Sequence, residues 1–216
     1  MGRLFCWVSL ARRIVTGLGV AVTLVLSFVD LNWLFRPLPS LGMIPEVVIA
    51  LPLGIIAFVV NKRPLKFFGI RPVGLRDMGA AILAFFAVFA VVAIAEPVVN
   101  AFAGPSPSAP GGDPLRSAPV WLALILAVSA GVCEEFVYRG FLIEELGLLI
   151  RNRGLAAVAA MVSFALTHHN SLGWSIELIY PGLIGAVLTA LYLRRRNLPI
   201  CMLLHAALDS LHAVIR

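Results

Sequence analysis

Two adjacent glutamates and an arginine, Glu134, Glu135 and Arg139, lie in one of the most apolar stretches of the sequence. At the centre of a membrane helix each such group costs about 2.5–3.5 kcal/mol, so three groups facing lipid would cost on the order of 8–10 kcal/mol. We therefore expect these side chains to face protein or water. Glu135 and Arg139 are one helical turn apart, so Arg139 can neutralise one carboxylate and leave the other for chemistry. A structural ion pair at the end of a span is the alternative for this pair alone.

Two further pairs of residues with helical spacing follow along the chain. Phe164 and His168 are one turn apart at the end of an apolar run, and His205 and Asp209 are one turn apart inside another. A carboxylate one turn from an imidazole can accept its N–H or stabilise the imidazolium. Taken singly, His168 is typical of an interfacial residue, Phe164 of packing, and His205 with Asp209 of a polar helix contact or a proton relay. Together these groups can meet only in the interior of a helical bundle, where ionisable residues are functional by default.

The composition predicts the elements that would position these residues. Of the 216 residues, 61% are hydrophobic and 13% are charged, whereas soluble domains average about 45–50% and 25%. The sequence therefore indicates an all-α, polytopic integral membrane protein. Runs of about 17–25 apolar residues predict about seven spans. These runs are 14–35, 44–60, 78–102, 119–149, 155–169, 176–193 and 198–215.

Most of the 17 basic residues fall in loops that share one side of this predicted topology. Because Lys and Arg accumulate in cytoplasmic loops, the pattern predicts a cytoplasmic N terminus. The same placement of basic residues in loops that contact anionic lipid headgroups explains the net charge of +6. The basic residues do not form the kind of surface that binds nucleic acid. The residues on the cytoplasmic side are Arg3, Arg12, Arg13, Lys62, Arg63, Lys66, Arg71, Arg76, Arg151, Arg153, Arg194, Arg195 and Arg196. Those outside are Arg36, Arg116 and Arg216.

A segment rich in Pro, Gly and Ser, 104–118, cannot hold regular structure and predicts a flexible external loop. It separates a three-span N-terminal part, 1–103, from a four-span part, 119–216, which carries all three residue pairs. The two parts can still pack as one integrated membrane domain.

The ordered set Glu134-Glu135-x-x-x-Arg139, Phe164-x-x-x-His168 and His205-x-x-x-Asp209 resembles the motifs of the CPBP family. This family contains CAAX prenyl proteases and bacteriocin-processing or immunity enzymes, and is also called the ABI family. The resemblance covers about residues 118–216 and does not extend to the first three spans. It implies an intramembrane endopeptidase that hydrolyses a peptide bond in a membrane-associated peptide or lipidated protein.

The resemblance also implies roles for the residues of the motifs. Glu134 would act as the general base on a water that His168 helps to orient, and His205 with Asp209 would bind the oxyanion. The supporting residues would be Glu135, Arg139 and Phe164. The prenyl-protease pattern leads us to expect Asn at position 209. An ionised Asp cannot donate a hydrogen bond, so Asp209 would act by keeping His205 charged. This departure weakens any inference to prenylated substrates.

Three alternatives remain open at this point. Glu134, His168 and His205 are ligand types that could hold a catalytic zinc, although no His-Glu-x-x-His motif is present, and a reaction without a cofactor is favoured. The same buried groups could serve a proton-coupled transporter, or the chain could be a non-catalytic membrane scaffold or immunity protein. The compact chain favours the cell membrane of a prokaryote.

Overall fold

The computed structural model describes residues 2–29, 44–102, 118–172 and 176–215. All the regular structure of these residues is helical, as the composition predicts. The segment 104–118, predicted as a flexible loop, lies outside the described residues except for its last position.

The helices are α1 (Gly2–Leu26), α3 (Ile44–Gly54), α4 (Leu75–Phe102), α6 (Val120–Glu135), α7 (Gly147–Ile150), α8 (Arg153–Thr167), α9 (His169–Leu172), α10 (Ile179–Arg195) and α11 (Leu198–Val214). Two segments are wound as π-helix, η2 (Ile55–Val60) and η4 (Phe136–Leu146), and two are 3-10 turns, η3 (Leu65–Phe68) and η5 (Ile176–Leu178).

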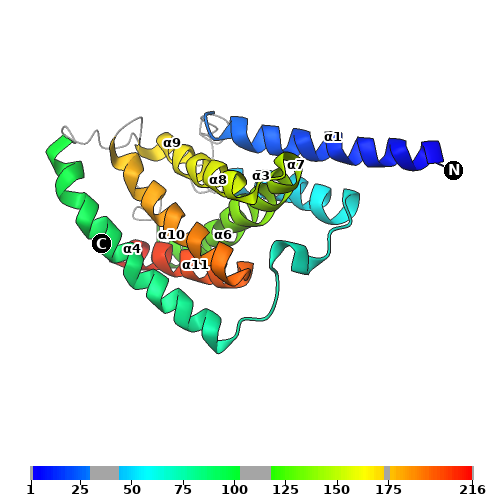
Figure 1. Cartoon of the computed structure of the whole chain (residues 1–216). Helices are drawn as coiled ribbons and strands as arrows, with labels where there is room; N and C mark the ends of the chain where they lie inside the picture. The colour runs from blue at the N-terminus through cyan, green and yellow to red at the C-terminus, as the bar shows by residue number, and fades with distance from the viewer. Residues whose placement is uncertain (1, 30–43, 103–117, 173–175, 216) are drawn as a thin grey trace.

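The bundle is built around α6 and α11, which pack closely along one another (Figure 1). Their backbones approach so closely that a Cβ on Gly131 of α6 would lie 2.7 Å from the backbone nitrogen of Ala206 on α11. The helix α8 packs on η4 and α10. On the outside, α4 covers α10 and α11, and α1 lies against η2 and η4. The pair α6 and α11 therefore forms the centre to which the other helices attach.

Three described helices are long and apolar enough to cross a membrane, namely Leu75–Phe102, Val120–Ile150 and Ile176–Arg195. They coincide with the predicted spans 78–102, 119–149 and 176–193. Shorter apolar helices, Val47–Val60, Arg153–Thr167 and Leu198–Val214, lie at three more predicted spans. Seven spans and a cytoplasmic N terminus stay predictions, because length and composition alone do not establish a crossing or its direction.

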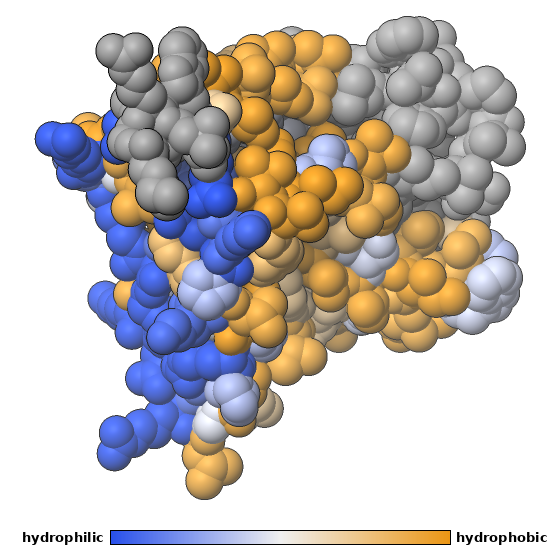
Figure 2. Space-filling view, turned by 90° about the vertical axis from the view of Figure 1, so that its right-hand side faces the viewer, coloured by the Kyte–Doolittle hydropathy of each residue, from blue (hydrophilic) through white to orange (hydrophobic). Residues whose placement is uncertain are grey.

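The outer surface of the bundle carries many large apolar side chains. Leu83, Phe86 and Val59 are 73%, 64% and 65% exposed. In Figure 2 hydrophobic residues cover much of the surface, and hydrophilic residues gather along one side of the view. A contiguous apolar exterior of this kind is unstable in water and suits contact with lipid chains.

Three buried carboxylates bind five arginines at one end of the bundle, in a cluster that we call the arginine layer. Asp77 binds Arg71 and Arg195 at 3.0 and 2.9 Å. Glu145 binds Arg63 at 3.0 Å. The members of the arginine layer are Asp77, Glu144, Glu145, Arg63, Arg71, Arg153, Arg195 and Arg196. They join the segment 61–77 to the turn between α10 and α11, so the N-terminal part is attached to the helix that carries His205.

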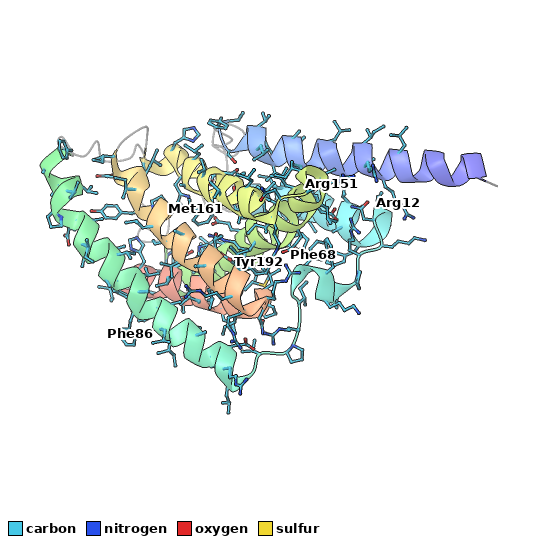
Figure 3. The ribbon with its side chains drawn as sticks, in the orientation of Figure 1. Arg12, Phe68, Phe86, Arg151, Met161 and Tyr192 are labelled. Atoms are coloured by element: carbon cyan, nitrogen blue, oxygen red, sulfur yellow. The ribbon has the colours of Figure 1, made fainter. Side chains whose placement is uncertain are left out.

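Backbone contacts strengthen the same attachment. Leu198 N–H donates to the Gly69 carbonyl at 2.9 Å, and the Tyr192 hydroxyl oxygen lies 3.2 Å from the Phe68 carbonyl oxygen; Tyr192 and Phe68 are neighbours in Figure 3. Gly69 has φ +72°, and a Cβ there would lie 2.9 Å from the Arg196 carbonyl oxygen. A glycine is therefore required where the segment meets the turn.

Candidate active site

The first part of the site lies where α6 changes into η4. Glu134 and Glu135 are the last residues of α6, and the wider π-helical turn of η4 begins at Phe136. π-helical turns are rare and occur frequently at functional sites, because the extra residue per turn changes which side chains face the bundle interior. Arg139 lies on η4 and donates to Glu135 Oε1 over 2.8 Å. Both side chains are essentially inaccessible, at 1% and 0% exposed.

Arg139 also contacts two other helices. Its Nη2 donates to the Gly185 carbonyl of α10 at 3.2 Å, and its guanidinium carbon lies 4.3 Å from the centre of the Phe164 ring of α8. A Cβ on Gly185 would lie 2.9 Å from Phe164 and 3.5 Å from Arg139 Nη2. The absence of a side chain at Gly185 lets three helices meet around one guanidinium group. Sequence reasoning missed Gly185, since nothing in the spacing distinguishes it from the other glycines.

The second part of the site is His205 on α11, whose imidazole lies between three carboxylates. Its Nδ1 is 2.8 Å from Glu135 Oε1. Its Nε2 is 3.8 Å from Glu134 Oε2 and 3.6 Å from Asp209 Oδ2. Because a carboxylate oxygen only accepts, Nδ1 carries a hydrogen and donates it to Glu135. The group that orients His205 is therefore Glu135 as well as the predicted neighbour Asp209, and sequence spacing gives no sign of this contact across helices.

The third part is the end of α8, where the last carbonyls have no partner within the helix. His168 Nδ1 lies 2.9 Å from the Phe164 carbonyl oxygen. A carbonyl oxygen only accepts, so Nδ1 carries the hydrogen, and the neutral ring keeps its lone pair on Nε2. The Phe164 ring centre lies 4.9 Å from that of His168 and 5.8 Å from that of His205. Phe164 thus contacts both imidazoles.

The structure brings the predicted residues into one cluster from α6, η4, α8 and α11. Glu134, Glu135, Arg139, His205 and Asp209 are joined by the contacts above, and Phe164 connects His168 to them. The predicted span 119–149 is one long helix whose winding changes from α to π directly after Glu135.

Access to the cluster is uneven. The side chains of Glu134 and Asp209 are 15% and 28% exposed, while Glu135 is fully buried. Among the described buried atoms, Glu134 Oε2, Glu135 Oε2 and Arg139 Nε have no hydrogen-bond partner. An unpaired buried polar atom is costly and rare. Glu134 and Glu135 therefore each keep one carboxylate oxygen that can still accept a hydrogen bond, and Glu134 is the more accessible of the two.

A catalytic zinc needs at least three ligands that converge within about 2.0–2.2 Å of the ion. In the described part of the chain, no group of three His, Cys, Asp or Glu side chains is arranged as such a set, and this includes Glu134, His168 and His205. The described residues therefore do not fit zinc.

Sequence reasoning also missed the hydroxyl groups near His168 and the carboxylates of the arginine layer. The Tyr138 hydroxyl donates to Thr167 Oγ1 at 3.3 Å, and Thr167 donates to the Phe164 carbonyl at 2.7 Å. Glu144 and Glu145 repeat the adjacent-carboxylate pattern of Glu134 and Glu135. That repetition in an apolar stretch is the signal that could have identified them.

The part of the chain that carries the cluster resembles a known protein family. Residues 116–211 match the family described as Rce1-like, type II CAAX prenyl endopeptidase. No curated protein and no solved structure was found to match the chain. The matched residues contain the whole cluster, and the family is one of CAAX-type intramembrane proteases. The site-bearing part of this membrane protein, residues 116–211, is therefore similar to the Rce1-like family of type II CAAX prenyl endopeptidases.

Proposed function

We propose that the protein is an intramembrane endopeptidase in which Glu134 activates a water to hydrolyse a peptide bond. The observation that carries the proposal is the arrangement of Glu134 Oε2, an unpaired buried carboxylate oxygen, 3.8 Å from His205 Nε2. This separation is too long for a direct hydrogen bond and suits two groups that bind the same small reactant between them.

The reaction proceeds in two stages. Glu134 accepts a proton from water while the water oxygen bonds to the carbonyl carbon of the scissile peptide. The carbonyl oxygen becomes an oxyanion, and an N–H of the His205 imidazolium donates to it. The carbon–nitrogen bond then breaks, and the proton held by Glu134 passes to the leaving amine. The lone pair on His168 Nε2 accepts a hydrogen bond from the same water and orients it.

Glu135, Arg139 and Asp209 support these steps. Glu135 binds the His205 Nδ1–H and is itself bound by Arg139, so the imidazole is held in one orientation. Asp209 is negatively charged beside His205 Nε2 and favours the imidazolium form, which is the form that donates to an oxyanion. Phe164 packs between Arg139 and the two imidazoles.

The substrate is a peptide or lipidated protein in the membrane, for example a prenylated C-terminal tail or a leader peptide. The exposed residues of the 61–76 segment, including Lys62 and Lys66, contact anionic lipid headgroups. The membrane is the cell membrane of a prokaryote. These assignments extend the family's chemistry to this chain.

The proposal is tested by a proteomic comparison of membranes that contain the wild-type chain or Glu134→Gln. Peptides that lose a cut in Glu134→Gln membranes identify the substrate, provided that both proteins insert to equal levels. An identical set of cleavage products would overturn the proposal.

Two other functions and one cofactor give different outcomes. A non-catalytic scaffold or immunity protein would co-purify with a partner and yield no cleavage product. A proton-coupled transporter would move protons across reconstituted vesicles. A zinc enzyme would lose activity with a chelator and regain it with Zn²⁺, whereas we expect a chelator to leave the activity unchanged.

A further inference from the structure

The hydroxyl groups around the end of α8 form a buried chain that leads to His168. The Tyr138 hydroxyl donates to Thr167 Oγ1, and the Thr167 hydroxyl donates to the Phe164 carbonyl oxygen. That oxygen also accepts the His168 Nδ1–H. Both donors thus converge on one carbonyl, which uses its two lone pairs.

Another hydroxyl contact joins α8 to the N-terminal part of the molecule. Ser27, just beyond the end of α1, donates to the Thr23 carbonyl oxygen over 3.1 Å and forms a hydrogen bond with Ser163 of α8, the residue before Phe164. Ser27 and Ser163 are 0% and 3% exposed, so this contact is sealed from solvent. Ser27 lies outside residues 116–211, and α1 thereby contributes to the surroundings of an imidazole in the family-matched part.

The order of donors fixes where each hydrogen lies. Tyr138 occupies an acceptor position on Thr167 Oγ1, which turns the Thr167 hydrogen towards the Phe164 carbonyl. Chained hydrogen bonds polarise one another in a low-dielectric interior. A fixed carbonyl keeps the hydrogen on His168 Nδ1 and leaves the lone pair on Nε2, the nitrogen that can accept a proton or a hydrogen bond.

We propose that Tyr138 and Thr167 are positioning residues that hold His168 as its Nδ1–H tautomer, so that Nε2 can orient the reacting water. The part of this inference that concerns the reaction rests on the proposed function. The part that concerns the tautomer does not, and it can be measured separately.

His169 provides an internal comparison. Its Nδ1 lies 2.7 Å from the Leu166 carbonyl oxygen, in the same type of contact. The Thr167 hydroxyl donates to the Phe164 carbonyl and not to that of Leu166. The hydroxyl chain should therefore affect His168 and leave His169 unchanged.

The test uses Tyr138→Phe and Thr167→Val, which remove one hydroxyl each and keep nearly the same shape. The full chain, labelled with ¹⁵N-histidine and placed in lipid bilayers, is studied by solid-state NMR, in which Nδ1–H and Nε2–H tautomers give distinct ¹⁵N shifts. We expect both variants to increase the Nε2–H form of His168 without changing His169. Thr167→Ser, which retains the hydroxyl, should restore the wild-type spectrum.

Thr189→Val is the matched control. Thr189 is also a buried threonine, on α10, but its hydroxyl has no hydrogen-bond partner. Loss of an unpaired hydroxyl is nearly neutral, so Thr189→Val should leave the His168 spectrum unchanged. If Thr167→Val and Tyr138→Phe also left it unchanged, the positioning role would be overturned.

The catalytic consequence is measured with a quenched fluorescent, farnesylated peptide that ends in a CAAX sequence. If this peptide is cleaved, we expect kcat to fall about 10-fold in Thr167→Val and Tyr138→Phe with KM unchanged, as is typical when a group behind a reactive imidazole is lost. A shifted tautomer with unchanged kcat would overturn the catalytic part. If the wild-type protein cleaved no peptide and the two variants still shifted the His168 tautomer, the proposed function would be contradicted and the tautomer assignment supported.

Discussion

The long helix from Val120 to Ile150 carries two pairs of adjacent glutamates, and the two pairs differ in how fully their oxygens are bonded. Glu144 Oε1 accepts hydrogen bonds from Arg153, Arg196 and Tyr192. Both oxygens of Glu145 accept from Arg63. In the first pair, ten residues earlier in the sequence, Glu134 Oε2 and Glu135 Oε2 are buried without a hydrogen-bond partner.

This difference separates a structural role from a chemical one. Each carboxylate of the arginine layer accepts hydrogen bonds from arginine side chains, and together these contacts hold the segment 61–77 on the bundle. The carboxylates of the site retain unpaired oxygens in a nearly sealed interior. Such atoms cost free energy in the resting protein. A bound reactant that donates a hydrogen bond to them would remove this cost.

The largest expected effect is that of Glu135→Gln, since Glu135 forms a buried ion pair with Arg139 and also orients His205. Its Oε1 binds Arg139 and the His205 Nδ1–H. Loss of the charge leaves a fully buried arginine without its ion pair, which costs about 3–5 kcal/mol. Thermal unfolding in detergent should show a large fall in Tm, and peptidase activity should disappear. The exposed Glu96→Gln is the control, and equal stability of the two variants would contradict this role.

Glu134→Gln should abolish activity and leave the fold intact. The amide has nearly the same shape but is not a base, so we expect kcat to fall about 10²–10⁴-fold. No arginine depends on Glu134 for an ion pair in the described structure, and Tm should stay close to that of the wild type. A variant with normal cleavage rate would remove Glu134 from the proposed reaction.

Glu144→Gln should show the opposite pattern, with a loss of stability and retained chemistry. Arg153 and Arg196 are 38% and 39% exposed, so water compensates for part of the lost attraction. We expect a destabilisation of about 1–3 kcal/mol, measured as a lower Tm. The kcat of the folded fraction should match that of Glu96→Gln. A selective loss of kcat without a change in Tm would break the proposed distinction.

Asp209→Asn should give the smallest effect. The amide can donate directly to an oxyanion, which replaces the support that the charge of Asp209 gives to His205. We expect kcat to stay within about tenfold of the wild type, since a single hydrogen bond contributes about 0.5–1.5 kcal/mol. Asp209→Leu, which can neither donate nor carry charge, should lower kcat more strongly. Equal activity of the two variants would show that position 209 takes no part.

The sequence by itself determined the helical, membrane-embedded character of the protein, because the amount and run length of apolar residues leave few other folds. It also predicted the candidate site residues, which the structure brings into one cluster. Charged groups such as Glu134 and Arg139 are too costly to face lipid, and spacings of four residues place Phe164 with His168 and His205 with Asp209 on common helix faces.

Only the tertiary structure decided which groups meet across helices. The contact of Glu135 with His205, the space at Gly185 for Arg139, and the hydroxyl chain to His168 depend on the π-helical turns of η4 and on the close approach of α6 and α11. These contacts join residues far apart in the chain, so periodicity carries no information about them. The arginine contacts of Glu144 and the unpaired oxygen of Glu134 were likewise indistinguishable in sequence, because adjacent glutamates look alike until their neighbours in space are known.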